Sequence, residues 1–193
     1  MKINSKLFNP YFIILTSLFF VACENDIAKV NSITAELQNK LPIESGKNVE
    51  IIYSDSAKVK AKLTAPQLDR YITKKSQMVF PKGLAVIFYD GQQKQKNKLT
   101  ANYGVGYDNG TQLEKMEVKN NVVVVNEKGD KLETEHLTWN AATQKIFTDK
   151  FVKITTKEEV IWGDGLEANQ DFSEYEIKNV KGQLSIKEEE FKN

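Results

Sequence analysis

The amino-acid sequence predicts an all-β domain, built as an elongated and curled antiparallel sheet, behind a short N-terminal targeting segment. Three observations carry this prediction. Apolar and polar residues alternate with a period of two in the chain after Val49, which is typical of half-buried strands. A similar segment recurs four times at intervals of 33 to 36 residues. The most apolar stretch, residues 11–22, lies near the N-terminus and directly precedes the chain's one cysteine.

The first 22 residues are typical of a secretory signal. Lys2 and Lys6 precede Tyr11–Ala22, a run of twelve residues without a charge. As a helix this run would span about 18 Å, whereas a bilayer core needs roughly 30 Å. The segment therefore predicts the apolar region of a signal peptide.

The residues around Cys23 resemble a bacterial lipoprotein cleavage site, in which a small residue, here Ala22, precedes the cysteine that is acylated. We therefore expect residues 1–22 to be a lipoprotein signal peptide and Cys23 to be the lipid anchor. An uncleaved N-terminal membrane anchor is the alternative. Residues 23–48 are mostly polar and predict a flexible tether, residues 49–187 the folded domain, and residues 188–193 a charged C-terminal tail.

Strands are expected in order along the domain. Lys58–Ala65 alternates strictly between polar and apolar residues, and short apolar runs bounded by turns indicate further strands. The turns are expected at Asp90-Gly91 and at Lys128–Asp130. The runs are Leu84–Tyr89, Val122–Val125 and Lys145–Thr156, the last as two strands around Asp149-Lys150.

The internal repeat is the most informative pattern. Leu63, Leu99, Leu132 and Leu166 begin similar segments, with differences of 36, 33 and 34 in residue number. Each is followed roughly 20 residues later by another apolar strand. Repeats of this kind stack and share one continuous core. The two end strands of such a stack are open edges, which can accept a strand from another protein.

The repeat carries a family resemblance through three motifs. Gly129-Asp130-x-Leu132-x-Thr134-x-x-Leu137-x-Trp139 comes first. Ile146-x-Thr148-Asp149-x-x-Val152-x-Ile154 follows, and then Gly163-x-Gly165-Leu166-x-Ala168-x-x-Asp171. In this order they resemble the OstA/LptC family of periplasmic lipopolysaccharide-transport proteins, over about Val59 to Ile186.

This resemblance implies a twisted β-jellyroll whose apolar groove holds the lipid A acyl chains of lipopolysaccharide. It also implies a location on the periplasmic side of the inner membrane in a Gram-negative bacterium. Its partners would be the membrane subunits of an ABC transporter at the N-terminal edge and an LptA-like periplasmic bridge protein at the C-terminal edge. The domain would receive lipopolysaccharide from the transporter and pass it to the bridge.

Residue-level expectations follow from the alternation and the repeat. Val59, Ala61, Leu184 and Ile186 are expected on the partner-binding edge strands, and Gly163 and Gly165 in a structural turn. Residues that face inward on their strands either line the groove or fill a packed core. They are Leu63, Val86, Phe88, Leu99, Val122, Val124, Leu132, Val152, Ile154, Leu166 and Leu184.

Composition excludes several other functions. The chain has 27 basic and 26 acidic residues, one histidine and one cysteine, so it predicts no nucleic-acid binding, no metal site and no cofactor. His136 has no nucleophile motif beside it, and we expect a structural or surface role for it rather than a catalytic one. The protein is therefore predicted not to be an enzyme. A periplasmic lipoprotein that binds carbohydrate or protein on the same scaffold is the alternative, and it requires a fully packed interior and covered edges.

Overall fold

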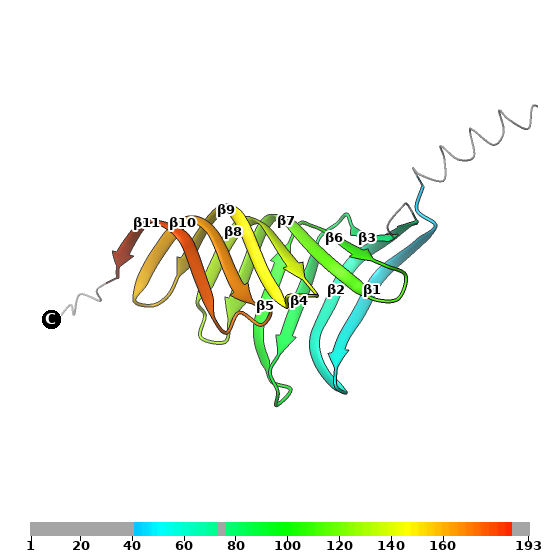
Figure 1. The fold of residues 1–193 in the computed structure, drawn as a ribbon, viewed down its shortest axis with the longest axis horizontal. Coiled ribbons are helices and arrows are strands. Elements are labelled where there is room, and N and C mark those ends of the chain that lie inside the picture. The colour runs from blue at the N-terminus through cyan, green and yellow to red at the C-terminus, as the bar shows by residue number, and fades with distance from the viewer. Residues whose placement is uncertain (1–40, 73–75, 187–193) are drawn as a thin grey trace, which may run out of the picture. The chain divides into compact units, whose positions relative to one another are not determined.

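The described part of the chain is entirely β. The computed structural model describes residues 41–72 and 76–186, which form eleven antiparallel strands and no helix, hence no helix able to cross a membrane. In Figure 1 the strands follow one another along the long axis of this β unit, with β1 and β11 at opposite ends. The predicted all-β class is confirmed. The strands are β1 (Glu44–Asp55), β2 (Lys58–Ile72), β3 (Ser76–Phe80), β4 (Leu84–Tyr89), β5 (Gln95–Ala101), β6 (Tyr103–Asp108), β7 (Leu113–Asn126), β8 (Lys131–Asn140), β9 (Lys145–Thr155), β10 (Glu159–Asn169) and β11 (Tyr175–Ser185).

Two long strands, β2 and β7, each pair with two different strands along one side. Residues 61–64 of β2 pair with β4, and residues 69–72 pair with β3. Residues 123–126 of β7 likewise pair with β5, and residues 113–119 pair with β6. The sheet therefore folds along a line that crosses its strands. This line divides it into a β4–β5 half and a β3–β6 half, and the other long strands have one end in each half. This folded antiparallel sheet is the predicted β-jellyroll.

The line along which the sheet folds, here called the seam, is marked by left-handed backbone conformations. Gly83 lies on it between β3 and β4 with φ of 80°, and Asn120 and Asn121 lie on it in β7 with φ of 63° and 52°. A Cβ atom at Gly83 would lie 2.7 Å from the carbonyl oxygen of Ala101, so only glycine fits there. Asparagine tolerates the left-handed region better than most residues, which suits the bend in β7.

One apolar row crosses eight strands of the β4–β5 half. Directly opposite residues of an antiparallel ladder point to the same face. The strand registers therefore place eight side chains side by side on one face, and we call this set the interior row. Three of the four repeat leucines belong to it, which explains the spacing of the repeat. Its members are Ile51, Leu63, Val86, Leu99, Val124, Leu132, Ile154 and Ile161.

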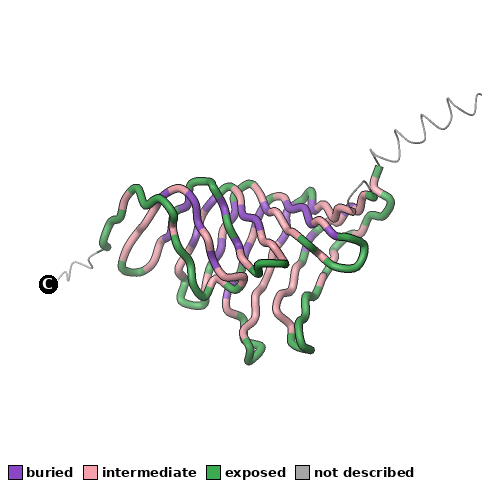
Figure 2. The backbone as a smooth tube through the Cα atoms, in the orientation of Figure 1, coloured by how far each residue is buried: buried purple, intermediate pink, exposed green. Residues whose placement is uncertain are grey.

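The core lies between the two halves of the sheet. Leu99 and Val124 of the β4–β5 half belong to the same buried cluster as Val118 and Leu137 of the β3–β6 half. Figure 2 shows buried residues concentrated in the middle strands and exposed residues at the turns and along β11. The packing of the two halves against each other removes apolar surface from water, which stabilises the fold by about 25 cal/mol per Å².

The structure differs from the expectation at the start of the domain. β1 begins at Glu44, before Val49, and pairs with β2 along its whole length, from Glu44 opposite Arg70 to Asp55 opposite Lys58. Its first residues do not alternate between polar and apolar types. A strand at the edge of a sheet tolerates this because one of its sides faces water.

Two expectations in the second half of the domain are corrected. Lys145–Thr155 is one strand, β9, in which Asp149 and Lys150 bulge opposite Gly165 of β10. Gly163 and Gly165 lie within β10 rather than in a turn. A Cβ atom on Gly163 would overlap the carbonyl oxygen of Asn179 in β11, and Gly165 has φ of 79°. Both glycines therefore serve the bend of β10 at the seam.

Truncation of Leu166 and of Leu184 provides a matched test of this core. Leu166 is fully buried, whereas Leu184 is 61% exposed. Leu166→Ala is expected to lower the free energy of unfolding by about 2–5 kcal/mol, and Leu184→Ala by no more than about 0.5 kcal/mol. Urea denaturation followed by tryptophan fluorescence measures both. Equal losses in the two variants would contradict the placement of the core.

Candidate functional site: an apolar cavity

A cavity of about 260 Å³ lies between the two halves of the sheet. The β4–β5 half contributes one wall, from β1, β2, β4 and β5, and the β3–β6 half contributes the other, from β7, β8 and β9. Its lining is mainly apolar. The lining residues are Ile51, Tyr53, Lys60, Ala61, Leu63, Val86, Phe88, Tyr89, Asp90, Gly91, Leu99, Leu113, Met116, Val118, Leu137, Trp139, Ile146, Gln170 and Asp171.

Aromatic pairs connect the two halves beside this cavity. The ring of Tyr53 in β1 meets Trp139 in β8 edge to face, with centroids 5.9 Å apart. Phe88 in β4 meets Phe172, in the turn between β10 and β11, in the same manner at 5.8 Å. Such pairs stabilise by about 0.5–1.5 kcal/mol beyond their buried area. They hold the halves together on the side away from the seam.

The turn between β10 and β11, residues 170–174, reaches across the cavity to the β4–β5 half. Asn97 of β5 donates a hydrogen bond from Nδ2 to the carbonyl oxygen of Asp171. The backbone N–H of Ser173 binds Asp171 Oδ1 at 3.0 Å, and the N–H of Phe172 binds the carbonyl oxygen of Asn169 at 2.9 Å. This turn is therefore an internally ordered strap over one side of the cavity.

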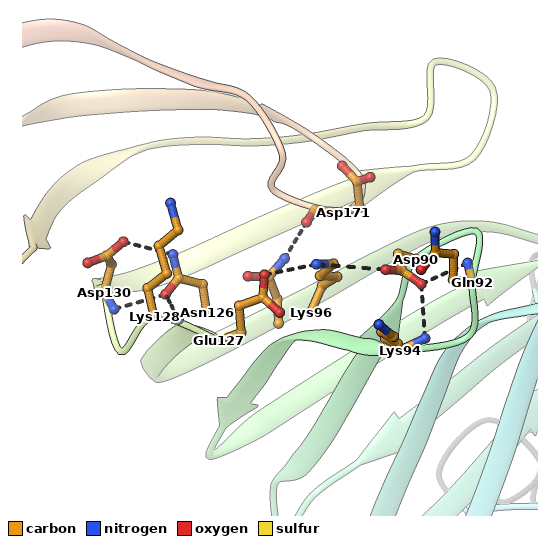
Figure 3. Close-up of polar contacts among 10 residues, drawn as sticks. Asp90, Gln92, Lys94, Lys96, Asn126, Glu127, Lys128, Asp130 and Asp171 are labelled. Atoms are coloured by element: carbon orange, nitrogen blue, oxygen red, sulfur yellow. Dashed lines mark hydrogen bonds and ion pairs between the residues drawn. The ribbon is translucent and has the colours of Figure 1, made fainter.

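A polar cluster surrounds Asp90, which lines the cavity (Figure 3). Asp90 Oδ1 accepts the backbone N–H groups of Lys94 at 2.9 Å and of Gln92 at 2.8 Å. Lys96 Nζ lies 2.8 Å from Glu127 Oε1 and 3.7 Å from Asp90 Oδ2. The pKa of Asp90 is lowered first by the hydrogen bond from the Lys94 backbone. The hydrogen bond from the Gln92 backbone and the charge of Lys96 lower it further. The Asp90 carboxylate is thus ionised and already supplied with donors.

A second ionic cluster lies on the outward face of the β3–β6 half. Glu117 lies 2.7 Å from Lys115 Nζ, 2.8 Å from Lys119 Nζ and 3.8 Å from His136 Nε2. Burial of Glu117 opposes ionisation, but the hydrogen bonds from the two lysines outweigh it and lower its pKa to about 2. Burial, and then the charge of Lys119, lower the pKa of His136. Because this face points away from the cavity, the cluster belongs to the surface and not to the site.

The predicted groove residues occupy four kinds of place. Leu63, Val86, Phe88 and Leu99 line the cavity. The interior row continues beyond the cavity through Val124, Leu132 and Ile154, which are buried. Fully buried positions in the core are held by Val122, Val152 and Leu166. Leu184 is exposed, and since it pairs with Val160 it lies on the face opposite to Ile161, so it is not in the interior.

The predicted edge residues are partly misplaced. Val59 and Ala61 lie on β2, an inner strand that pairs with both β1 and β4. Within the described residues, β1 pairs only with β2 and β11 only with β10. The N-terminal edge is therefore β1, which sequence reasoning missed because its first residues do not alternate. Leu184 lies on the C-terminal edge strand, β11. Ile186 extends the pairing of this strand, since its backbone N–H donates a hydrogen bond to the carbonyl oxygen of Glu158 at 2.7 Å.

Sequence reasoning also missed one wall of the cavity. Leu113, Met116, Leu137, Trp139 and Ile146 come from the β3–β6 half, and none was expected in the groove. The repeat pattern emphasised the strands that form the interior row. The available signal was the aromatic residue that follows the leucine in the four repeat units, namely Tyr71, Tyr107, Trp139 and Tyr175. The predicted lipid anchor, Cys23, lies outside the described residues.

Fold and cavity together define a class of protein, the β-jellyrolls with an apolar space between the halves of one folded sheet. The family model described as "Lipopolysaccharide-assembly, LptC-related" matches residues 11–185. The chain therefore belongs to the LptC family. A comparison with curated proteins finds no match.

Membership confirms the predicted part in lipopolysaccharide transport. The LptC family is a transport component and not an enzyme family. Its members bind lipopolysaccharide and work with the Lpt transport system. They are periplasmic and associated with the inner membrane of Gram-negative bacteria.

Proposed function

We propose that this protein receives lipopolysaccharide from the inner-membrane ABC transporter and passes it through its jellyroll to the periplasmic bridge protein. The observation that carries the proposal is the apolar cavity and its continuation as the interior row. The row crosses the β4–β5 half from Ile51 in β1 to Ile161 in β10. An apolar path of this kind runs along the axis on which the strands are stacked.

The physical task in this transport is to keep acyl chains out of water. Each exposed CH₂ group costs about 0.8 kcal/mol, so a lipid with several acyl chains needs an apolar surface over its whole route. Inward-facing strand residues provide that surface without covalent chemistry. A complete acyl-chain cluster needs more room than 260 Å³, and the two halves would have to part on the strap side, where Phe88 meets Phe172.

The two free edges support the proposed order of transfer. In the part of the chain that the structure describes, β1 and β11 each have one pairing partner and leave one row of backbone groups unpaired. We propose that β1 pairs with the transporter's membrane subunits and β11 with the LptA-like bridge protein, by strand addition. Tyr175, Val180, Leu184 and Ile186 on and after β11 are apolar and 46–61% exposed, which suits a surface that another protein covers.

The alternative, a carbohydrate- or protein-binding lipoprotein, receives no support from these features. It required a fully packed interior and covered edges. A cavity with a mainly apolar lining is also a poor match for a carbohydrate, whose hydroxyl groups need many polar partners.

Site-specific photo-crosslinking tests the conduit. A photoreactive amino acid in place of Phe88 or Met116, which line the cavity, is expected to form an adduct with lipopolysaccharide in producing cells. The same amino acid in place of Lys119, on β7 near Met116 but on the outward face beside Glu117, is the matched control. Immunoblotting for lipopolysaccharide detects the adduct. No adduct at Phe88 or Met116, or an equal yield at Lys119, would refute the proposal.

Crosslinking from the edges tests the order of partners. A photoreactive residue in place of Ile52 on β1 is expected to trap a transporter subunit, and one in place of Val180 on β11 a bridge protein of different mass. Both side chains are more than half exposed. Mass spectrometry of the adducts identifies each partner. The same partner at both positions, or partners in the reverse order, would contradict the assignment of the edges.

We further propose that Cys23 carries the lipid that tethers the protein to the inner membrane. Its support is the sequence alone, in which Cys23 directly follows the apolar run that ends at Ala22. Metabolic labelling with a radioactive fatty acid is expected to mark the unaltered protein, and Cys23→Ala is expected to abolish both labelling and cleavage. If the Cys23→Ala protein has the same mass as the unaltered protein in cell membranes, residues 1–22 are an uncleaved anchor instead.

A further inference from the structure

Lys60 lines the cavity although its position breaks the alternation of its strand. Tyr53 of β1 pairs with Ala61 of β2, and the next residue, Ser54, pairs with Val59. Lys60 is therefore the extra residue of a β-bulge, a feature that turns a side chain away from its regular direction. Alternation alone places Lys60 outward, yet Lys60 is partly buried and belongs to the cavity lining.

The backbone around this bulge is held by the neighbouring turn. β2 pairs with β4 only from Ala61 onward. Before that point, the side chain of Gln93 takes the place of the ladder, since its Oε1 accepts the N–H of Val59 at 3.1 Å and its Nε2 donates to the Val59 carbonyl oxygen at 3.1 Å. The bulge that places Lys60 at the cavity is therefore built into the fold.

Lys60 is the one cation among the described residues that line the cavity. None of the residues that the structure describes places a carboxylate within ion-pair distance of its ammonium group. An ammonium group next to apolar walls has less water around it, so an anion that reaches it is bound more strongly than on an open surface.

The two acids that also line the cavity are engaged elsewhere. Asp90 accepts the N–H groups of Gln92 and Lys94 and lies beside Lys96. Asp171 accepts the N–H of Ser173 through Oδ1. Neither carboxylate neutralises Lys60, and both are supplied with other donors.

Lys62, two residues farther along β2, lies in the regular part of the strand and provides a comparison for Lys60. It pairs with Ile52 and Ile87, on the face opposite to Leu63. Its Nζ lies 2.9 Å from Glu50 Oε2, so its charge is neutralised by a neighbouring strand. The two lysines differ in direction and partner but carry the same charge.

We propose that Lys60 determines specificity by binding the anionic headgroup, such as a phosphate, of an amphiphile whose acyl chain occupies the cavity. The inference rests on the proposed transport function and adds the headgroup contact to it. The apolar lining holds the chain and the ammonium group at the mouth holds the charge. The cavity therefore selects anionic amphiphiles over neutral ones with the same chain.

Two matched probes test this selection. Both carry the same photoreactive dodecyl chain, one ending in phosphate and the other in neutral maltoside. The full-length protein, in nanodiscs of neutral phosphatidylcholine, is irradiated with each probe, and mass spectrometry quantifies adducts on cavity peptides. The unaltered protein is expected to favour the phosphate probe about tenfold, as one charge-assisted hydrogen bond provides.

The lysine variants separate the headgroup contact from general charge. Lys60→Met is expected to reduce the preference to about one through loss of the phosphate adduct. The maltoside probe is still expected to label cavity peptides, which shows that the cavity is intact. Lys60→Arg is expected to keep the preference. Lys62→Met removes the same charge from the outward face and is expected to keep it as well.

The contrary results distinguish a failure of the role proposed for Lys60 from a failure of the proposed transport function. An unchanged preference in Lys60→Met, or an equal loss in Lys62→Met, overturns the role of Lys60 while the conduit stands. If both probes label the unaltered protein equally, the role of Lys60 is likewise overturned while the conduit stands. If neither probe labels the cavity of the unaltered protein, the proposed function itself fails.

Discussion

The structure depends above all on the alignment of apolar residues across antiparallel strands. In the interior row, eight side chains from eight strands stand opposite one another, from Ile51 to Ile161. A slip of one residue in any strand would turn its apolar set to the outward face, where residues such as Lys62 and Lys98 now stand. This constraint explains why the repeat has nearly constant length, since three of its four units return a leucine to the same row.

The bend of the sheet turns this row into an interior. Strands longer than ten residues, such as β2 and β7, serve both halves because their backbone bends at the seam, at Asn120 and Asn121 in β7. The β3–β6 half then closes over the β4–β5 half, with Phe80 and Leu137 filling the space near the seam. Farther from the seam the halves diverge, and the cavity opens there. A flat sheet with the same sequence pattern would leave the row exposed to water.

Charge is distributed according to face. The outward face carries pairs that neutralise each other, such as Lys62 with Glu50 and Glu117 with Lys115 and Lys119. Exposed pairs of this kind contribute little stability, but they keep a broad β surface soluble. Among the described residues that line the cavity, Lys60, Asp90 and Asp171 carry charge. Where a cation does enter, at Lys60, the cause is an irregularity of the backbone and not the pattern of the strand.

The sequence by itself determined the fold class, the antiparallel order and most of the interior row, because alternation and repeat length are properties of neighbouring residues along the chain. It could not show which apolar residues surround space and which fill the core, since Leu63 and Leu166 have the same pattern and only the packing of the two halves separates them. It also placed the N-terminal edge on β2 instead of β1, and Lys60 outward. Both depend on contacts between distant segments, namely the pairing of Glu44–Asp55 with β2 and the bulge held by Gln93. Such contacts exist only once the sheet has folded, so tertiary structure alone decided them.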